Sequence, residues 1–308
     1  MVSKDYEYKD EEGIKTNKMI TEKPDIYYII LDGYGRNDIL KKYYGYDNTE
    51  FIKSLQDKGF YWASKSHCNY SWSFLSICSS LNFKYLNYLT NTIDINTKNR
   101  KIPYEMIKNN NVLKFVKKHG YTYIHFNSTW GGTTGNIYAD KEIGYREGIF
   151  NDEFLRVLSY TTVLRIFDYF VVEKLAEVHL YNFKMLETIP EMKESTFTFA
   201  HIMPPHHPFI FDRNGNIKSK RTVKSQFTPG RMAAQWKKKD AYIDQLVFVN
   251  KKVSTIINTI LEKSDIPPII IIQSDHGPHV LEAPKNEYDI ARTSILNLFY
   301  LPGEALWL

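Results

Sequence analysis

The chain has 308 residues, 43% of them hydrophobic and 24% charged, which is the composition of a globular protein with a sizeable core. Lys and Arg number 40 against 35 Asp and Glu, and the net charge of +5 is too small and too spread out to indicate nucleic-acid binding. The two cysteines, Cys68 and Cys78, lack the spacing of a cysteine zinc site and predict no disulfide framework.

The two ends of the chain differ in character from the middle. Residues 1–23 are polar and charged, and we expect a flexible tail there rather than a signal peptide or a membrane anchor. No stretch reaches the roughly 18 apolar residues that span a bilayer. Residues 294–308 indicate a strand, a Pro-Gly turn and an apolar stop, which suggests C-terminal truncation, with a short natural terminus as the alternative. Residues 24–308 are expected to form one domain.

Strand and helix patterns alternate through the first half of this domain. The apolar run at 25–31 predicts a strand that helices cover on both faces. Helical spacing follows at 48–60, and 61–70 resembles a short second strand. A serine-rich start opens a helix at 71–86, and residues 112–126 indicate a helix, a glycine stop and a strand.

The second half continues the alternation. A long amphipathic helical region covers 152–187, and its apolar positions predict core packing, with a lid or a membrane-facing surface as the alternative. Residues 195–211 predict a strand that enters a Pro/His loop, and 236–264 predict a long helix. Four isoleucines at 269–272 predict a strand buried on both faces, and 294–300 a final strand. The whole pattern predicts an α/β fold with a mostly parallel central sheet and helices on both faces.

Reactive side chains stand where four of these elements begin or end. Asp32 follows the first strand, and Asp275 with His276 follows the isoleucine strand. Serines open the helix at 71–86 and histidines follow the strand that begins at 195, namely Ser71, Ser73, Ser76, His201, His206 and His207. Each feature is ordinary alone, because Asp-Gly forms turns, serines cap helices and prolines stiffen loops. In open α/β sheets, however, ligands bind at the carboxyl ends of the strands.

The joint pattern indicates a metal site. Two carboxylates, an imidazole and a hydroxyl that converge at one sheet edge would be costly without a cation, because buried charges need partners. Three oxygens and one nitrogen suit Mn²⁺, Mg²⁺ or Zn²⁺. We therefore expect one divalent metal ion as a cofactor, Mn²⁺ or Mg²⁺ in preference to Zn²⁺.

Four quoted stretches together resemble the alkaline phosphatase/sulfatase superfamily. The stretches are YYIILDGYG, CNYSWSFLSICSSLN, PPHHPF and SDHG, and they cover most of residues 24–303. The combination is similar to the sulfatase-like branch of phosphoglycerol and phosphoethanolamine transferases, which includes lipoteichoic acid synthases. The resemblance implies an alkaline phosphatase-like fold and one divalent ion held by Asp32, Ser73, Asp275 and His276. It also implies that Ser73 is the nucleophile and that His206, rather than His207, faces the substrate.

The chemistry of the residues agrees with that implication. A divalent ion lowers the pKa of a coordinated hydroxyl, so Ser73 would need no general-base histidine to attack a phosphoester. The start of a helix adds positive potential for the incoming phosphate. His206 would donate a hydrogen bond to the phosphate or protonate the leaving group, and the product would be a covalent phosphoserine.

Several other positions carry weaker signals. The resemblance places His125, Asn127 and Trp130 in a substrate groove, although a strand end with a packed Trp explains them equally well. His201, on a strand expected to be buried, is interpreted as a hydrogen-bonded core histidine. His279 is interpreted as a surface histidine rather than an extra ligand. Arg292 is interpreted as one half of a structural ion pair, with bidentate anion binding as the alternative.

Alternative functions remain open at this point. Neither cysteine has the Cys-x-Pro-x-Arg context of a formylglycine sulfatase, which argues against that subclass. A catalytically inactive relative that binds a glycan or lipid headgroup is one alternative, and a sulfuric ester hydrolase is another. The expected partner is a phosphate- or sulfate-ester substrate, for which the resemblance suggests a lipid or glycan link, and not nucleic acid. The resemblance implies cell-envelope chemistry at the outer face of a bacterial membrane, although the chain as written shows neither a signal peptide nor a membrane span.

Overall fold

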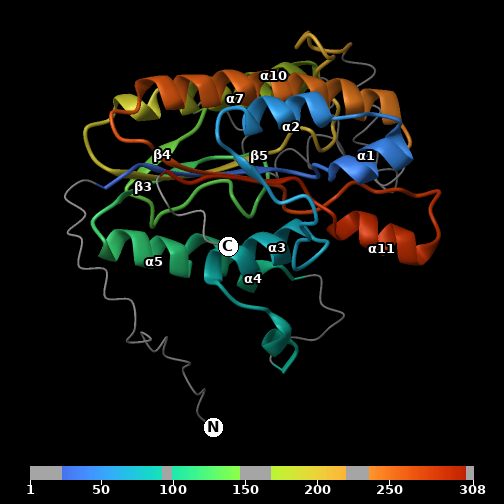
Figure 1. The fold of residues 1–308 in the computed structure, drawn as a ribbon. Helices are drawn as coiled ribbons and strands as arrows, with labels where there is room; N and C mark the ends of the chain where they lie inside the picture. Colours follow the sequence, from blue (N-terminus) through green and yellow to red (C-terminus); the bar gives the residue numbers. More distant parts are fainter. Residues whose placement is uncertain (1–22, 92–98, 146–167, 220–235, 303–308) are drawn as a thin grey trace.

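A seven-stranded sheet lies between two layers of helices in the computed structural model, which describes residues 23–91, 99–145, 168–219 and 236–302 (Figure 1). The strand order is β2-β7-β6-β1-β5-β3-β4. The strands are β1 (Ile26–Leu31), β2 (Tyr61–Trp62), β3 (Thr122–Phe126), β4 (Lys141–Ile143), β5 (Thr196–Ile202), β6 (Ile269–Gln273) and β7 (Asn297–Tyr300). The pairings from β6 through β1, β5 and β3 to β4 are parallel, whereas β7 is antiparallel to β6 and to β2. The prediction of a mostly parallel sheet is therefore confirmed.

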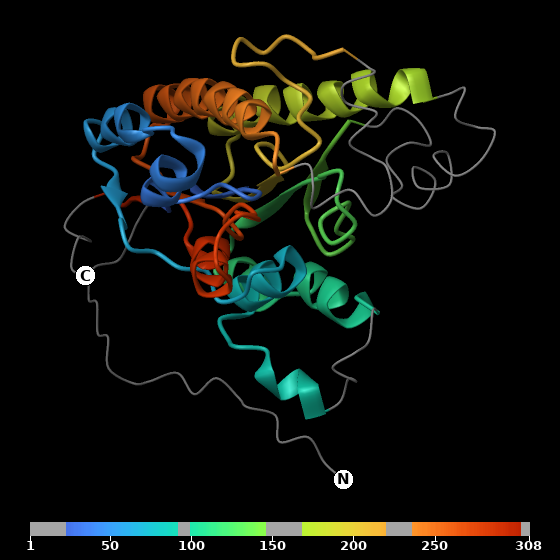
Figure 2. The same cartoon turned by 90° about the vertical axis from the view of Figure 1, so that its right-hand side faces the viewer.

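Helices cover both faces of the sheet, as predicted (Figures 1 and 2). One layer contains α1 (Asn37–Tyr44), α2 (Thr49–Gln56), α7 (Asp168–Leu186) and α10 (Lys239–Lys263). The other layer contains α3 (Ser73–Asn82), α4 (Lys101–Lys108), α5 (Asn111–Lys118) and α11 (Lys285–Thr293). Short 3₁₀ turns, η1 (Asn87–Asn91) and η4 (Ile189–Glu191), connect other elements.

The alternation of side chains along β1 divides the core into two parts. Ile29 belongs to the cluster that contains Leu246 of α10, whereas its neighbour Ile30 belongs to the cluster that contains Ile77 of α3. Successive residues of a strand point to opposite faces, so a strand with helices on both sides must be apolar at nearly every position. This explains why the sequence of β1 reads as an unbroken apolar run.

The isoleucine strand β6 departs from the predicted two-sided burial. Ile270 and Ile272 are buried, but Ile269, Ile271 and Gln273 are only half-buried. The half-buried side chains alternate with the buried ones, so one face of β6 is less completely buried than the other. The strand lies one step closer than β1 to the antiparallel edge formed by β7 and β2.

The long helical region predicted at 152–187 is described from Asp168 onward, and the residues before it lie outside the described part of the chain. From Val172 onward, apolar side chains of α7 that include Leu175, Phe183 and Leu186 pack in the same core cluster as α10. The apolar positions between 155 and 171 lie outside the side chains that the structure describes, so the core-packing interpretation of that part stays a prediction. None of the helices in the described ranges is long and apolar enough to cross a membrane.

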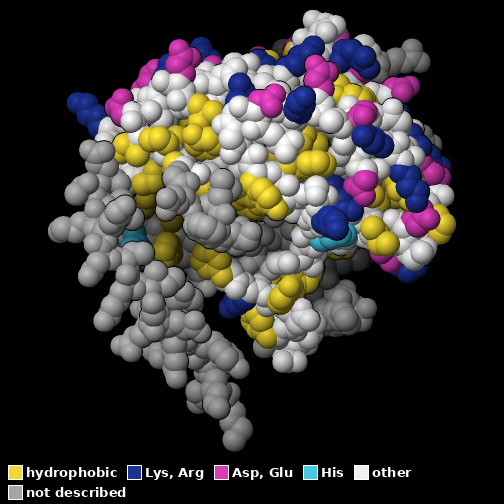
Figure 3. Space-filling model, viewed as in Figure 1, with side chains coloured by type: hydrophobic (Ala, Val, Ile, Leu, Met, Phe, Trp, Pro, Cys, Tyr) yellow, Lys and Arg dark blue, Asp and Glu magenta, His cyan; other side chains and the backbone are white. Residues whose placement is uncertain are grey.

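Charged side chains of both signs are interspersed over the upper part of the face shown in Figure 3, with apolar side chains between them. This mixture fits the small net charge of +5 and offers no broad basic surface for a nucleic acid on that face.

Candidate active site

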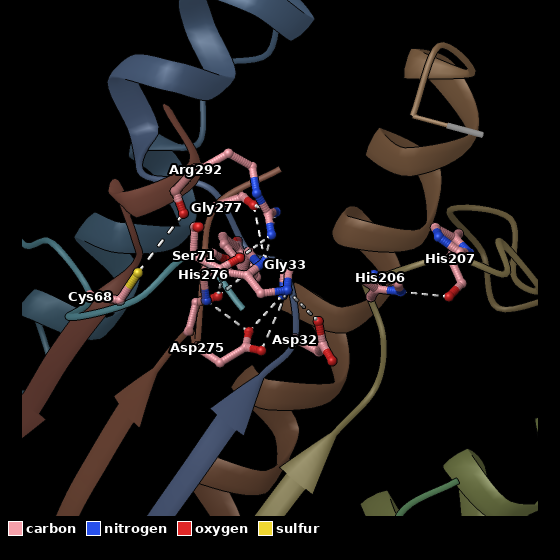
Figure 4. A network of polar contacts seen from close by, with 12 residues as sticks. Asp32, Gly33, Cys68, Ser71, His206, His207, Asp275, His276, Gly277 and Arg292 are labelled. Atoms are coloured by element: carbon pink, nitrogen blue, oxygen red, sulfur yellow. Dashed lines mark hydrogen bonds and ion pairs between the residues drawn. The ribbon is translucent and has the colours of Figure 1, made fainter. Parts of the chain in front are cut away.

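The end of β1 places Asp32 in the interior, at 1% exposure. Its backbone N–H donates to the Ile202 carbonyl at the end of β5 (2.9 Å), and its carbonyl accepts from the His206 N–H (3.0 Å). The next residue, Gly33, adopts φ 69°, a left-handed conformation that favours glycine, and donates its N–H to Asp275 Oδ1 (3.0 Å). Asp32 is thus fixed between the ends of the two neighbouring strands, β5 and β6 (Figure 4).

The loop after β6 is fixed just as firmly. Asp275 Oδ1 accepts from the N–H of His276 (2.8 Å) in addition to Gly33, and the Ser274 hydroxyl donates to the His276 carbonyl (2.7 Å). Gly277 follows, and a Cβ there would lie 1.9 Å from the Ala291 carbonyl oxygen. No other residue fits that position without a backbone shift, so the glycine of SDHG is a requirement of the loop.

Asp32, Asp275 and His276 converge at this edge of the sheet (Figure 4). His276 Nε2 lies 3.5 Å from Asp32 Oδ1 and 3.5 Å from Asp275 Oδ2. Both of these oxygens are buried, and neither accepts a well-formed hydrogen bond. Two overlapping sets in the described part of the chain could each offer three ligand atoms within 4.8 Å of one another: Asp32, His206 and His276, and Asp32, His201 and Asp275.

The charges of these groups fit a cation. Burial, together with the charge of Asp32, raises the pKa of Asp275 to about 6. Burial also acts to raise the pKa of Asp32, but His206, His201 and His276 outweigh it and hold that pKa below its usual range. Burial and the neighbouring Arg292 hold the pKa of His276 well below its usual value, so its imidazole is neutral and keeps a lone pair. Buried acceptors without donors, beside a neutral imidazole, are what a divalent ion would complete.

Ser73 is the first residue of α3 and is half-buried. Its hydroxyl is close enough to the Asp275 carboxylate to lower the pKa of that group by hydrogen bonding. No side chain caps the start of α3, where Trp72 occupies the cap position with an exposed indole. The uncapped helix start favours an anion near Ser73.

His206 reaches the same region from the loop after β5. Its N–H donates to the carbonyls of Asp32 (3.0 Å) and Met203 (2.9 Å), and its ring lies edge-on to buried Trp236 at a centroid distance of 5.2 Å. Nδ1 lies 2.6 Å from the His207 carbonyl, which can only accept, so Nδ1 carries a proton and Nε2 remains for the site. The His206 and His276 rings are 6.0 Å apart.

His201 is buried and hydrogen-bonded, as expected for a core histidine, but one of its two contacts is with Asp32 of the site. Its Nε2 lies 3.3 Å from Asp32 Oδ2, and its Nδ1 lies 2.9 Å from the Thr133 hydroxyl. The signal in the sequence is a histidine near the end of a strand that also carries Thr196 and Thr198. Its contact depends on the register that pairs it with Ile30 of β1.

The predicted substrate residues lie at different depths. Trp130 meets the His201 ring edge-on at 5.5 Å, which places its indole beside the site. His125 is buried behind Thr133, whose carbonyl lies 3.0 Å from its Nε2, and burial lowers its pKa to about 4. Asn127 is half-buried and accepts at its carbonyl from Asn182 (2.9 Å). Their contact with a substrate stays a prediction.

Arg292 and His279 differ from their predicted roles. Arg292 is 4% exposed and donates to the carbonyls of Gly277 and Ser71, with one nitrogen 2.9 Å from His276 Nδ1. No carboxylate of the described residues lies within salt-bridge distance of it, so it braces two loops instead of forming an ion pair. His279 is half-buried, with Nδ1 2.5 Å from the Tyr288 hydroxyl, and is not a surface histidine.

Comparisons with known structures show the same fold. The periplasmic domain of EptC from Escherichia coli superposes with a TM-score of 0.56 at 15% identity, over 95% of this chain and 74% of that one. The soluble domain of lipooligosaccharide phosphoethanolamine transferase A from Neisseria meningitidis gives 0.53 at 12% identity, over 92% and 78%. The lipoteichoic acid synthase LtaP from Listeria monocytogenes gives 0.51 at 14% identity, over 92% and 66%.

A search of curated proteins found no match. The family model described as Sulfatase, however, matches residues 24–296, which is most of the chain. The chain belongs to the sulfatase family, in the sulfatase-like branch of the alkaline phosphatase/sulfatase superfamily.

Proposed function

We propose that this chain is a metal-dependent enzyme that transfers or hydrolyses phosphate esters through Ser73. The observation that carries the proposal is a pair of buried carboxylate oxygens, on Asp32 and Asp275, that face His276 and accept no well-formed hydrogen bond. The Ser73 hydroxyl lies near enough to the Asp275 carboxylate to lower its pKa. Membership of the sulfatase family supports an enzyme of this type. In this proposal residues 24–308 are the catalytic domain and residues 1–23 a tail.

Asp32, Asp275, His276 and Ser73 would hold one divalent ion, Mn²⁺ or Mg²⁺ in preference to Zn²⁺. Bound there, the ion would supply positive charge that eases loss of the Ser73 proton and offsets negative charge on the phosphate. The donor set fits, because carboxylate oxygens, a hydroxyl and a neutral imidazole suit these ions. A Zn complex of EptC is among the similar structures, which supports zinc as the alternative.

Ser73 would attack the phosphorus in line with the ester bond. The Ser73 hydroxyl gives up its proton to solvent as the Oγ–P bond forms, the bond between phosphorus and the leaving oxygen breaks, and the leaving oxygen takes up a proton. Protonated His206 would donate that proton, or a hydrogen bond to a phosphate oxygen, from Nε2. Water or an acceptor hydroxyl then attacks phosphorus and releases Ser73.

The structural neighbours suggest the kind of substrate and the place of action. Their names refer to lipooligosaccharide phosphoethanolamine transfer and lipoteichoic acid synthesis, and two are periplasmic or soluble domains. A phosphoester linked to a lipid or glycan, processed at the extracytoplasmic face of a bacterial membrane, is the substrate we propose.

Two rival functions are weaker. A sulfuric ester hydrolase is favoured by the family description alone, and the chain has no cysteine in the formylglycine context at the nucleophile. An inactive relative that only binds a headgroup would have no need to keep Asp32, Asp275, His276 and Ser73 together.

The test combines metal analysis with turnover of a chromogenic phosphodiester and its matched sulfate ester. We expect near-stoichiometric metal, faster phosphate-ester cleavage, and a loss of kcat of about a thousandfold or more in Ser73→Ala. Ser76→Ala, one turn further along α3, is the matched control and should retain most activity. Unchanged turnover in Ser73→Ala would contradict the nucleophile assignment. Metal-free protein that binds a glycan without turnover would favour the inactive relative.

A further inference from the structure

Gln245 of α10 holds the loop that carries His206. The side chain is fully buried, at 0% exposure. Its Nε2 donates to the carbonyls of His206 (2.9 Å), Pro205 (3.2 Å) and Pro208 (3.3 Å). Its Oε1 accepts from two backbone N–H groups further along the loop, Ile210 (2.7 Å) and Phe211 (3.1 Å). One amide therefore contacts five backbone groups on both sides of His206.

The loop needs such a partner because of its own sequence. Pro204, Pro205 and Pro208 have no N–H, so the loop has few donors to satisfy its own carbonyls. Most of the loop is buried, which removes water as a substitute. Buried backbone groups are costly when they lack partners. A primary amide is the side chain that offers donors and acceptors in one group, so Gln245 can serve both halves of the loop.

The same contacts determine where the His206 ring lies. The His206 N–H is tied to the Asp32 carbonyl (3.0 Å) and its own carbonyl to Gln245 (2.9 Å), so the backbone of His206 spans the site and α10. The ring then lies against Trp236, with Nδ1 bonded to the His207 carbonyl. Loss of the hydrogen bond to Gln245 would free the His206 carbonyl and leave the backbone of His206 held only through its N–H.

We propose that Gln245 is a positioning residue for His206, which sets Nε2 of that imidazole relative to Asp32 and His276. This inference rests on the proposed function, in which His206 contacts the phosphate or the leaving group. Gln245 itself contacts only the loop and touches no reacting atom.

The test is the nearly isosteric change Gln245→Met, with Asn110→Leu as the matched control. Asn110 is also a fully buried amide, and it caps α5 through Leu113 (2.7 Å) without contacting the site. We expect kcat of Gln245→Met to fall about ten- to a hundredfold with KM within about twofold, because small displacements of a catalytic group reduce rates by such factors. Asn110→Leu should lower the melting temperature and leave kcat unchanged. If Gln245→Met does not fold, Gln245→Glu keeps an acceptor for Ile210 and Phe211 and replaces the donors by a second carboxyl oxygen.

A double-mutant cycle separates positioning from a general structural role. If Gln245 acts through His206, adding Gln245→Met to His206→Ala should cause no further loss of kcat. An additive loss in the double variant would overturn the proposal.

The ring ¹⁵N signals of His206, assigned by their absence in His206→Ala, give a readout that requires no turnover. We expect one tautomer with Nδ1 protonated in the parent chain and averaged signals in Gln245→Met. Unchanged ring signals in Gln245→Met would also overturn the proposal. If the parent chain cleaves no ester, the proposed function fails, while the ring signals still decide whether Gln245 positions His206.

Discussion

Two buried polar clusters lie close together in this fold, and they differ in whether their polar atoms all have hydrogen-bond partners. In the first, Tyr34, Asn48 and Asn250 form a closed ring: Tyr34 donates to Asn250 (2.5 Å), Asn250 to Asn48 (2.8 Å), and Asn48 back to Tyr34 (2.8 Å). We call it the neutral ring. The second, the strand-end cluster, consists of Asp32, Asp275 and His276, and it leaves two carboxylate oxygens without donors.

The burial of the two clusters is similar, so burial does not explain the difference. The members of the neutral ring are 0%, 1% and 7% exposed, and those of the strand-end cluster are 1%, 2% and 3% exposed. A satisfied neutral network specifies packing and requires nothing more. A buried pair of carboxylates, each with one oxygen that accepts no hydrogen bond, costs several kcal/mol, and this cost is offset when a cation binds. The comparison therefore assigns a structural role to the first cluster and a ligand to the second.

The largest effect should come from Asp275→Asn. This change removes a charged ligand and leaves the shape of the loop nearly intact, so we expect the affinity for Mn²⁺ to fall about a hundredfold or more, given that changes outside the ligand set already cost 10- to 100-fold. Calorimetric titration with MnCl₂ measures it directly. Mn²⁺ should raise the melting temperature of the parent chain but not that of the variant.

An unchanged Mn²⁺ affinity in Asp275→Asn would contradict the strand-end cluster as the metal site. The melting temperature of the metal-free variant is a useful control. It should equal or exceed that of the metal-free parent, because the variant no longer places a carboxylate beside Asp32.

Asn250→Leu is the matched change in the neutral ring, with a smaller expected effect. It leaves the Tyr34 hydroxyl without its acceptor and Asn48 Oδ1 without its donor, and each orphaned group costs about 1–3 kcal/mol. Urea denaturation should show a loss of unfolding free energy of this order. The Mn²⁺ affinity should stay within about twofold of the parent value, because no charged ligand changes. A tenfold loss of Mn²⁺ affinity would mean that the two clusters are coupled through Tyr34, and the comparison would fail.

The sequence predicted the centre of the fold better than its edges. The strands β1 and β6 are recognised by their apolar runs, because their side chains pack in a core that helices cover. The strand β5 is buried throughout, although it also carries Thr196, Thr198 and His201. The sequence interpretation does not include β4 or the helices α1, α4 and α11. Two of the three residues of β4 are exposed, and each of these helices has only two or three buried residues. Short elements with few buried positions leave little periodicity to detect.

The site divides in the same way. The sequence predicts that Asp32, His206, Asp275 and His276 lie together, because each follows a strand or stands in a short motif and parallel strand ends must meet at one edge. The structure brings these side chains together, and their role at a metal site stays a proposal. The contacts of His201, Gln245 and Arg292 depend on strand register and helix placement, which are tertiary properties. An arginine that braces carbonyl oxygens has the same local sequence as one that forms an ion pair, so the sequence does not separate these two roles for Arg292.

The smallest expected effect is a pH dependence confined to the metal-free protein. Burial and the charge of Asp32 raise the pKa of Asp275 to about 6, from an ordinary value of 3.8. Between these values the folded protein binds more protons than the unfolded chain, so the unfolding free energy decreases as the pH rises through this window. Asp32 contributes to the unfolding free energy with the opposite sign. Because the pKa of Asp32 is lowered, this contribution changes only at and below the ordinary pKa of an aspartate.

Urea denaturation with a chelator, at about pH 5 and about pH 7, should show the parent losing roughly 1–2 kcal/mol relative to Asp275→Asn over this interval, given 1.36 kcal/mol per unit of pKa shift. The difference between the two proteins isolates Asp275 from the other titrating groups. Saturating Mn²⁺ should remove the pH dependence that Asp275 adds to the unfolding free energy of the parent, because a bound cation keeps both carboxylates ionised in the folded state. If the unfolding free energies of the parent and Asp275→Asn depend on pH in the same way in the presence of the chelator, the strand-end cluster tolerates its two charges without a cation. The strand-end cluster would then need a ligand no more than the neutral ring does.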